Sequence, residues 1–285
     1  MATGTSVLPF SRRREPKVEV RAARVDEPVA RTLDEAGFGP HVARLLGYPR
    51  DSPDGHILVA AAGKKLVGGA CCASFGTSGW IGALGVLPRA RRRGTGDLLT
   101  RACINWLQSR GARSVFLYAT DMGRPVYERV GFVAEARARA WRGVAHGPPP
   151  EGVRRLRPSD RARILELDAL ATGEDRHAVL DMLPALLGLG IEREGVLEGF
   201  ALQTPWGAGP AIVAADAEAG LALLRGLVVE PQPLTITVPD DNPAASDALS
   251  RWGFQPVNSA LRMRYGAPVD HQPRRMFGLF NLFWG

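Results

Sequence analysis

The residue types best suited to chemistry gather in one short segment, LGVLPRARRRGTGDLL, at residues 84–99. In it an apolar run and a proline lead into three consecutive arginines, followed by Gly94 and Gly96. Glycine permits positive φ and a close approach of the backbone to a ligand. The first N–H groups of a helix lack internal partners and carry the positive end of its dipole. A helix that begins directly after this turn would therefore hold a phosphate group, with the arginines adding charge.

The flanking sequence predicts the elements that position this turn. Residues 79–87 read as a strand. After Gly96 the apolar residues recur at helical spacing, and Gly111 ends that pattern. The other strands predicted in the first half are residues 17–25, 56–62, 65–74, 114–119 and 132–140, and its other predicted helices are 26–36 and 124–130.

The same order of elements occurs twice along the chain. At an offset of 122 residues, Tyr127–Phe132 aligns with Leu249–Phe254, and both segments join a helix end to a Gly-Phe pair. A helix at 216–227 and a strand at 234–238 complete the second copy. This order indicates an internal duplication of one α/β unit.

Length and composition predict a globular protein of two domains. The chain has 285 residues, more than one ordinary domain, and the cluster GVAHGPPPEG at 143–152 is the clearest linker. Hydrophobic residues make up 45% and charged residues 23%, which excludes wholesale disorder. The predicted division is an N-terminal tail at 1–16, a first domain at 17–142, a linker at 143–151 and a second domain at 152–285.

Other sequence features exclude several classes of protein. The chain has no apolar run of about 18 residues, which a membrane-spanning helix needs. Residues 1–16 lack a signal-peptide pattern, so we expect a cytoplasmic protein. The three cysteines fit neither a disulfide framework nor a metal site, and Cys71 and Cys72 are expected on opposite faces of a strand.

The charge of the chain is divided unevenly. Residues 1–145 carry a net charge of +11 and residues 146–285 a net charge of −4. A basic half favours an anionic partner such as nucleic acid, a membrane surface or a phosphorylated small molecule. No aromatic platform or recognition-helix pattern accompanies the arginines, so we expect no nucleic-acid partner.

Three motifs, in this order along the chain, resemble those of the GCN5-related N-acetyltransferases (GNAT). They are Val86-x-Pro88, Arg91-x-x-Gly94-x-Gly96 and Tyr127-x-x-x-Gly131-Phe132. The resemblance covers residues 17–142 and implies an α/β fold whose domains each have a mixed, mostly antiparallel, twisted sheet flanked by helices. It also implies acetyl-CoA as cosubstrate, without a metal. The residues that the resemblance places around acetyl-CoA are Val86, Leu87, Arg91, Arg92, Arg93, Gly94, Thr95, Gly96, Asp97 and Thr120.

The second half resembles the C-terminal acetyltransferase-like module of tandem members of this superfamily. The residues that carry this resemblance are 167–169, 173–176, Asn242, Gly253-Phe254 and 262–266. In the duplicated alignment the loop falls on Val213–Glu218 and Tyr127 falls on Leu249. Asp216 and Glu218 at a helix start would repel an anion, so we expect the second half not to bind CoA.

The implied activity is acetyl transfer to an amine by direct attack, without a covalent enzyme intermediate. A backbone N–H of Val86 or of its neighbours would donate to the thioester carbonyl. Tyr127 matches the tyrosine that the family directs at the CoA sulfur. A phenol of pKa ~10 can protonate a thiolate whose parent pKa is ~8.5. The alternative role for Tyr127 is packing beneath the last strand.

Two positions depart from the family pattern. Many members carry a glutamate on the strand before the loop as general base, whereas residues 79–84 contain no acid. Water, or one of Asp54, His56 and Asp121, would then take the proton. Thr120 stands where the family often has asparagine.

Several roles stay open at the level of sequence. Asp168, Asp175 and Arg176 either face a substrate cleft or serve locally, the last two by starting a helix that runs to Leu187. The aromatic segment 274–284 is expected to dock on the protein rather than on a membrane. We expect acetylation of a small-molecule amine, with a non-catalytic acyl-CoA sensor and a protein acetyltransferase as alternatives, and a homodimer as a possible assembly.

Overall fold

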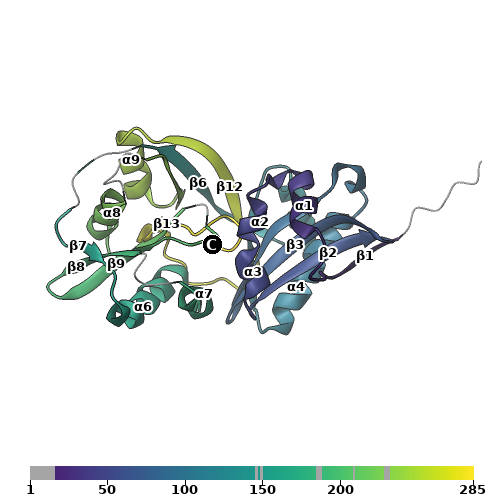
Figure 1. Cartoon of the computed structure of the whole chain (residues 1–285), viewed down its shortest axis with the longest axis horizontal. Helices are drawn as coiled ribbons and strands as arrows, with labels where there is room; N and C mark the ends of the chain where they lie inside the picture. The colour runs from purple at the N-terminus through teal and green to yellow at the C-terminus, as the bar shows by residue number, and fades with distance from the viewer. Residues whose placement is uncertain (1–16, 145–146, 148–149, 184–187, 208, 228–231) are drawn as a thin grey trace, which may run out of the picture.

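The computed structural model has two lobes that lie side by side (Figure 1). It describes residues 17–144, 147, 150–183, 188–207, 209–227 and 232–285. Some predicted segments lie outside these residues. They are the N-terminal tail at 1–16, parts of the linker, and the end of the helix predicted to run to Leu187. The last residue, Gly285, lies at the junction of the two lobes (Figure 1).

Residues 17–144 of the first half form six strands and five α-helices. The strands are β1 (Val18–Ala22), β2 (Gly55–Ala62), β3 (Lys65–Phe75), β4 (Ser78–Val86), β5 (Ser114–Ala119) and β6 (Val133–Gly143). The helices are α1 (Val29–Leu33), α2 (Val42–Leu45), α3 (Gly47–Asp51), α4 (Thr95–Ser109) and α5 (Arg124–Val130). A π-helical turn at Asp34–Phe38 follows α1, and Gly37 within it has φ of 111°.

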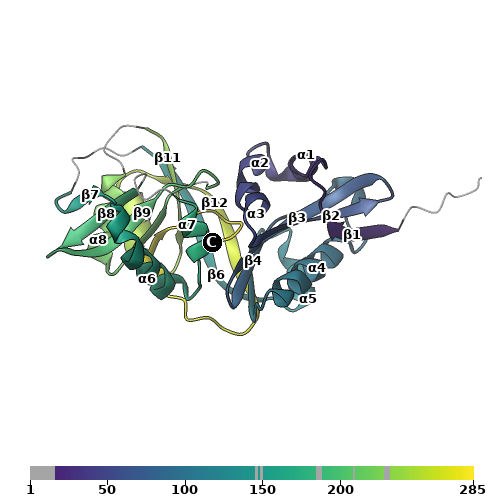
Figure 2. The ribbon, with the colours of Figure 1, turned by 60° about the horizontal axis from the view of Figure 1, so that its bottom comes forward.

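Helices cover both faces of this sheet, with α4 and α5 on one face and α1 to α3 on the other (Figure 2). Helix α4 buries Leu99, Cys103 and Leu107 against the sheet, at the spacing of one helical face. On the same side lies Cys72, whereas Cys71 packs with the core beneath α1 and α2. The prediction that the two cysteines point to opposite faces is therefore confirmed.

Strands β4 and β5 are parallel neighbours that pair only at one end. Their pairing runs from Ser78 opposite Ser114 to Trp80 opposite Phe116, although β4 continues to Val86. Beyond Trp80 the two strands diverge. We call the divergent region, β4 residues 81–86 facing β5 residues 117–119, the first splay.

The second half supplies the remaining elements. Its strands are β7 (Val153–Arg155), β8 (Gly188–Arg193), β9 (Val196–Leu202), β10 (Ala211–Ala214), β11 (Leu234–Pro239), β12 (Gln255–Gly266) and β13 (Met276–Gly278). Its helices are α6 (Arg161–Thr172), α7 (His177–Asp181), α8 (Ala217–Gly226) and α9 (Pro243–Arg251). Five strands form one sheet in the order β13-β10-β9-β8-β7.

The eight-stranded sheet runs through both halves in the order β1-β2-β3-β4-β5-β12-β6-β11. Strand β12 of the second half lies between β5 and β6 of the first, and β6 pairs in turn with β11 of the second. Each half therefore receives one strand from the other. Because β6 corresponds to β12 and β5 to β11 in the duplication, this exchange is symmetric about the β6–β12 pair.

The mixed α/β fold with sheets flanked by helices is confirmed. The predicted elements at 114–119 and 124–130 are confirmed to the residue. The helix predicted at 26–36 is wrong in its bounds, because residues 25–27 form a turn and the α-helix covers only Val29–Leu33.

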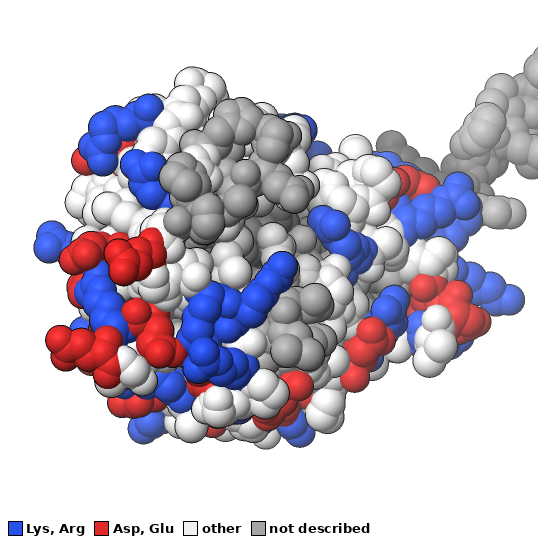
Figure 3. Space-filling model, turned by 60° about the vertical axis from the view of Figure 1, so that its left-hand side comes forward, with Lys and Arg blue, Asp and Glu red and all other residues white. Residues whose placement is uncertain are grey.

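The described surface adds two observations on possible partners. In the view toward the second half, Lys and Arg side chains intermingle with Asp and Glu side chains (Figure 3). Within the described ranges, every helix is too short or too polar to cross a membrane.

Candidate functional site

The glycine-containing loop leads directly into α4, as the sequence predicts. Gly94 precedes the first helical residue and has φ of 78°, a left-handed conformation that glycine adopts without strain. A Cβ at Gly94 would have no atom within 4 Å, so the backbone here borders open space. At Gly96 a Cβ would lie 3.4 Å from Val126, which lets α5 pack closely on the start of α4. This arrangement fits a phosphate group at the helix N-terminus.

The arginines of the loop differ in what they contact. Arg91 is half-buried, and its guanidinium donates to the backbone carbonyls of Val86 at 2.9 Å and Ala36 at 2.8 Å. It therefore braces the end of β4 against the first helical region. Arg92 is exposed and has φ of 60°, an unfavourable value for a side chain of its size. Its exposed guanidinium lies in the loop beside the first turn of α4.

The backbone of β4 is distorted at the first splay. Gly69 lies opposite Gly85 and Cys71 opposite Gly82, so β4 carries one extra residue between these pairs. Within this bulge Ala83 has φ of 48°, and strain of this kind concentrates at functional sites.

The bulge and the hydrogen bonds between β3 and β4 determine which N–H groups of β4 face the first splay. The Leu87 N–H donates to the Val67 carbonyl of β3 at 2.8 Å. Because N–H groups alternate along a strand, the Val86 N–H points to the opposite edge, toward the splay. Val86 is the better placed of these two predicted donors.

Tyr127 lies on α5, buried beside α4. Its side chain is 8% exposed, and its ring packs edge-on against Phe132 at 5.9 Å. Burial raises the pKa of the Tyr127 phenol above its ordinary value, and Cys103 adds to the rise. The group therefore stays protonated at neutral pH, as a proton donor must.

Asp97 and Thr120, which are predicted to contact acetyl-CoA, form hydrogen bonds within the protein. The carboxylate of Asp97 accepts a hydrogen bond from Arg129 at 3.1 Å, which ties α4 to α5. The exposed Thr120 accepts from the Gly123 N–H at 3.2 Å and shapes the turn before α5. Their contact with acetyl-CoA stays a prediction.

Of the three side chains considered as general base, Asp54 and His56 contact the C-terminal end of α4, whereas Asp121 lies two residues beyond β5, the strand that borders the first splay. Asp54 pairs with Arg110 at 2.8 Å, and His56 stacks on Trp106 at 4.8 Å. Trp106 is in the last turn of α4 and Arg110 follows the helix, so they lie about 17 and 22 Å along it from the loop. Asp121 is exposed and pairs with Arg137 at 3.0 Å.

The corresponding loop of the second half is much shorter. Eight residues separate β4 from α4, whereas only Ala215 and Asp216 separate β10 from α8. Asp216 caps α8 by accepting from the Ala219 N–H at 2.8 Å. The ungapped alignment of the loop with Val213–Glu218 is therefore wrong, because Val213 and Ala214 are strand residues and the loop is shortened rather than substituted.

A strand of the same chain fills the position that corresponds to the first splay. β13 pairs with β10, and the next residue, Leu279, donates its N–H to Thr237 of β11 at 2.8 Å. The buried Asn242 side chain donates to the carbonyls of Met276 at 3.0 Å and Arg274 at 3.3 Å. In the duplication Asn242 is the counterpart of Thr120. The protein's own backbone thus occupies the gap between β10 and β11.

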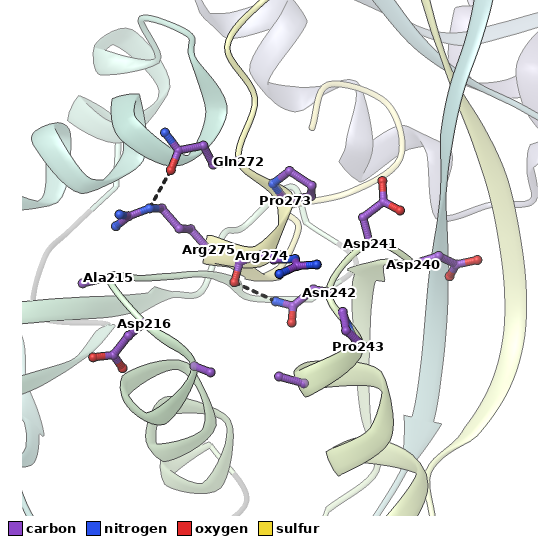
Figure 4. A pocket seen from close by; sticks show the side chains of 12 residues that line it. Ala215, Asp216, Asp240, Asp241, Asn242, Pro243, Gln272, Pro273, Arg274 and Arg275 are labelled. Atoms are coloured by element: carbon purple, nitrogen blue, oxygen red, sulfur yellow. Dashed lines mark hydrogen bonds between the residues drawn. The ribbon is translucent and has the colours of Figure 1, made fainter.

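A pocket of about 950 Å³ opens beside this segment. Figure 4 shows it between the start of α8, the start of α9 and the segment that contains Arg274 and Arg275. Asp216, Asp240 and Asp241 also line it. Arg274 and Arg275 line the same pocket, and Asp216 and Asp240 are paired with Arg193 and Arg139, so side chains of both charges surround it.

Sequence reasoning named Asp168 and Arg176 as facing a cleft or serving locally, but it missed the buried polar cluster between the two halves in which they pair with each other. Glu174, 6% exposed, accepts hydrogen bonds from Trp80 Nε1 at 3.0 Å and from Ser78 Oγ at 2.5 Å, both on β4. Arg176 donates to both oxygens of Asp168, at 2.9 and 2.5 Å, and this ion pair is fully buried. Arg176 directly precedes α7, which runs only to Asp181. These contacts depend on how the two halves pack against each other. The pattern of residues along the chain does not indicate that packing.

The aromatic C-terminal segment docks on the protein, as predicted. Phe277, Phe280 and Trp284 are each 0% exposed. Trp284 packs against the rings of Tyr48 at 5.1 Å and Phe280 at 5.4 Å. The segment therefore joins the second half to α3 of the first.

Protein-family models match both halves of the chain. A model of the acetyltransferase (GNAT) family matches residues 27–132, and a model of a GNAT acetyltransferase domain matches residues 164–278. A comparison with curated protein sequences gives no significant match.

Solved structures share the fold. A Pyrococcus horikoshii protein assigned as an acetyltransferase is 22% identical, with 99% of both chains covered and a TM-score of 0.79. A tandem GNAT protein from the clavulanic acid biosynthesis pathway is 15% identical, with 89% of this chain and 100% of that chain covered and a TM-score of 0.61. A GCN5-related N-acetyltransferase from Sphaerobacter thermophilus is 17% identical over 90% and 98%, with a TM-score of 0.59. The chain belongs to the GNAT family as a tandem member, and it is an acyltransferase.

Proposed function

We propose that the first half binds acetyl-CoA and transfers its acetyl group to a primary amine of a small molecule by direct attack. The observation that carries the proposal is the contrast between the halves. The first has a glycine loop at the start of α4 and a splay beside it, whereas β13 fills the corresponding gap of the second. One CoA site per chain follows.

Each step has a candidate group in the first half. Gly94, Thr95 and Gly96 present backbone N–H groups to the diphosphate, and Arg92 adds positive charge. The Val86 N–H faces the first splay and is placed to donate to the thioester carbonyl. Tyr127, held neutral by burial, donates a proton to the departing sulfur. The attacking amine loses its proton to water.

The enclosure of the splay supports a small acceptor over a protein amine. On the face opposite α4, Glu174 of the second half accepts a hydrogen bond from Trp80 of β4, and Phe283 of the C-terminal segment lies against Gly82 in the splay. A protein substrate would need an open groove at this face. A cytoplasmic location and a homodimer belong to the same proposal.

Two measurements on the intact protein test the proposed function. Calorimetry should show one CoA bound per chain, and an amine panel should release free CoA in amounts equal to the acetylated product. Absence of CoA binding would reject the proposal. Binding without turnover on any amine would favour an acyl-CoA sensor.

A further inference from the structure

The last seven residues, 279–285, form a segment that we call the tail. It leaves the second half after β13 and lies on β4 of the first half. A Cβ at Gly82 would lie 2.6 Å from the Phe283 carbonyl oxygen and 2.7 Å from the Phe283 Cβ. Only glycine at position 82 permits this approach. The tail therefore rests on β4 next to the bulge at Ala83.

The tail is held in place by its own buried side chains. Asn281 accepts hydrogen bonds from the backbone N–H groups of Phe283 at 2.7 Å and Trp284 at 3.0 Å. Trp284 is fully buried among rings from both halves. A turn anchored in this way fixes the position of Phe283 over β4.

Phe283 extends a layer of aromatic rings on β4. Phe38 packs edge-on against it, with ring centroids 5.5 Å apart and planes at 85°. A Cβ at Gly85 would lie 2.9 Å from the Phe38 ring, so this ring also sits directly on the strand. Both phenylalanines are only half-buried, which leaves part of each ring exposed.

Tyr118 forms the facing side of the first splay. It lies on β5, two residues beyond the last residue that pairs with β4. Its half-buried ring stacks on Trp80 at 5.3 Å, with planes at 24°, on the same face as the tail. Burial raises the pKa of Tyr118 to about 12, so the phenol is neutral.

This face is the side from which an acceptor must approach. With the CoA diphosphate proposed at the start of α4, the opposite face of the sheet, which carries α1 to α3, is left for the acceptor (Figure 2). Phe283 of the tail lies against Gly82 of β4.

The charged groups behind the rings already have partners. Arg262 pairs with Glu135, and its guanidinium lies 4.1 Å from the Phe116 ring centre. Arg176 pairs with Asp168, and Glu174 is held by β4. A carboxylate or phosphate on the acceptor would compete with these existing pairs, whereas an apolar body meets exposed ring surface.

We propose that Phe283, together with Phe38 and Tyr118, forms the wall that selects the acceptor, and that the acceptor is a compact primary amine with an aromatic or apolar body. Phe283 is the specificity-determining residue. This inference rests on the proposed function of the first half.

The test compares Phe283→Ala with Leu282→Ala. Leu282 is also half-buried in the tail and, like Phe283, packs against the core that both halves share, so its truncation matches the loss of apolar contact there. The contacts with the Phe38 ring and with Gly82 are those of Phe283. The substrates are 2-phenylethylamine, the longer 2-(biphenyl-4-yl)ethylamine, glucosamine and lysine. The wild-type protein should prefer 2-phenylethylamine. Phe283→Ala should raise the ratio of kcat/KM for the biphenyl amine over 2-phenylethylamine about tenfold. Leu282→Ala should leave this ratio at the wild-type value.

Each outcome decides between the two proposals. Loss of CoA binding by the wild-type protein would refute the proposed function. Normal CoA affinity with the same substrate ratio in all three proteins would overturn only the role of Phe283. A wild-type preference for glucosamine or lysine would overturn the substrate class. If circular dichroism shows that Phe283→Ala is unfolded, Phe283→Leu should give a smaller shift in the same direction, and an unchanged ratio there would overturn the role of Phe283.

Discussion

Replacing Gly94 by Asp and, separately, by Asn tests the phosphate loop through charge alone. The two side chains have the same shape, and both tolerate the left-handed backbone better than other residues do. A Cβ at this position meets no atom within 4 Å, so neither side chain is blocked by the fold. Gly94 has φ of 78°, and any cost of that conformation is shared by both variants.

The expected difference follows from Coulomb's law. A carboxylate at position 94 would lie ~5 Å from a diphosphate bound at the start of α4. With an effective dielectric constant between about 40 and 80, each pair of unit charges repels by roughly 1–2 kcal/mol. Two phosphate charges give about 2–3 kcal/mol, which is roughly a 30- to 150-fold loss of CoA affinity for Asp relative to Asn. At 1 M salt the difference should shrink because screening is stronger.

Calorimetric titration with CoA, paired with thermal unfolding of the free proteins, measures both quantities. Equal melting temperatures would show that the substitutions act on binding. Equal CoA affinity of the Asp and Asn variants would refute the electrostatic reasoning. Wild-type affinity in both would show that the diphosphate does not bind at this loop.

Four further substitutions have defined outcomes. Tyr127→Phe should lower kcat about 100-fold with unchanged CoA affinity, and a wild-type kcat would reject its role as proton donor. Asp168→Ala, which leaves Arg176 buried without its partner, should cost about 3–5 kcal/mol in urea denaturation, and a loss below about 1 kcal/mol would contradict a tightly buried pair. Burial and two neighbouring arginines lower the pKa of His271 to about 3. The neutral imidazole therefore contributes to the free energy of unfolding above its ordinary pKa of 6.5, and this contribution is lost as pH falls toward 3. Between pH 7 and 5 the unfolded state gains this proton, so the free energy of unfolding should fall by about 2 kcal/mol more in the wild type than in His271→Gln. Urea denaturation at both pH values measures the difference, and equal losses would contradict the lowered pKa. Asn242→Ala removes two hydrogen bonds to the segment around β13 and should lower stability by about 1–3 kcal/mol in the same assay, whereas an unchanged midpoint would show that β13 is held without it.

The elements around the loop could be predicted because their signals are local. Gly94, Gly96 and the helical spacing after them determine a turn and a helix from neighbouring residues alone. The strand at 114–119 and the helix at 124–130 are bounded by Gly and Pro in the same way. The steric preferences that end a helix or form a turn depend on a few neighbouring residues, so the sequence alone is enough to predict them.

The partners of the strands could not be predicted. Alternation along a strand indicates which face is buried, but it does not indicate which strand lies alongside. Strands β6 and β12 are duplicates with similar patterns, so placing either one beside β5 satisfies the same periodicity. The contact of Glu174 with Trp80 joins residues 94 positions apart, and neither residue's local sequence indicates the other.

The tail connects the filled gap of the second half to the acceptor site proposed in the first half. β13 occupies the gap between β10 and β11, where Asn242 holds its carbonyls. Five residues beyond β13, Phe283 reaches Gly82 on the first half. The position of the proposed acceptor wall is therefore set by how β13 is seated in the second half. A second half that bound CoA in this gap would have no room for β13, and the wall over β4 would lose its anchor. The seating of β13 in the second half is in this sense required for the geometry of the site proposed in the first half.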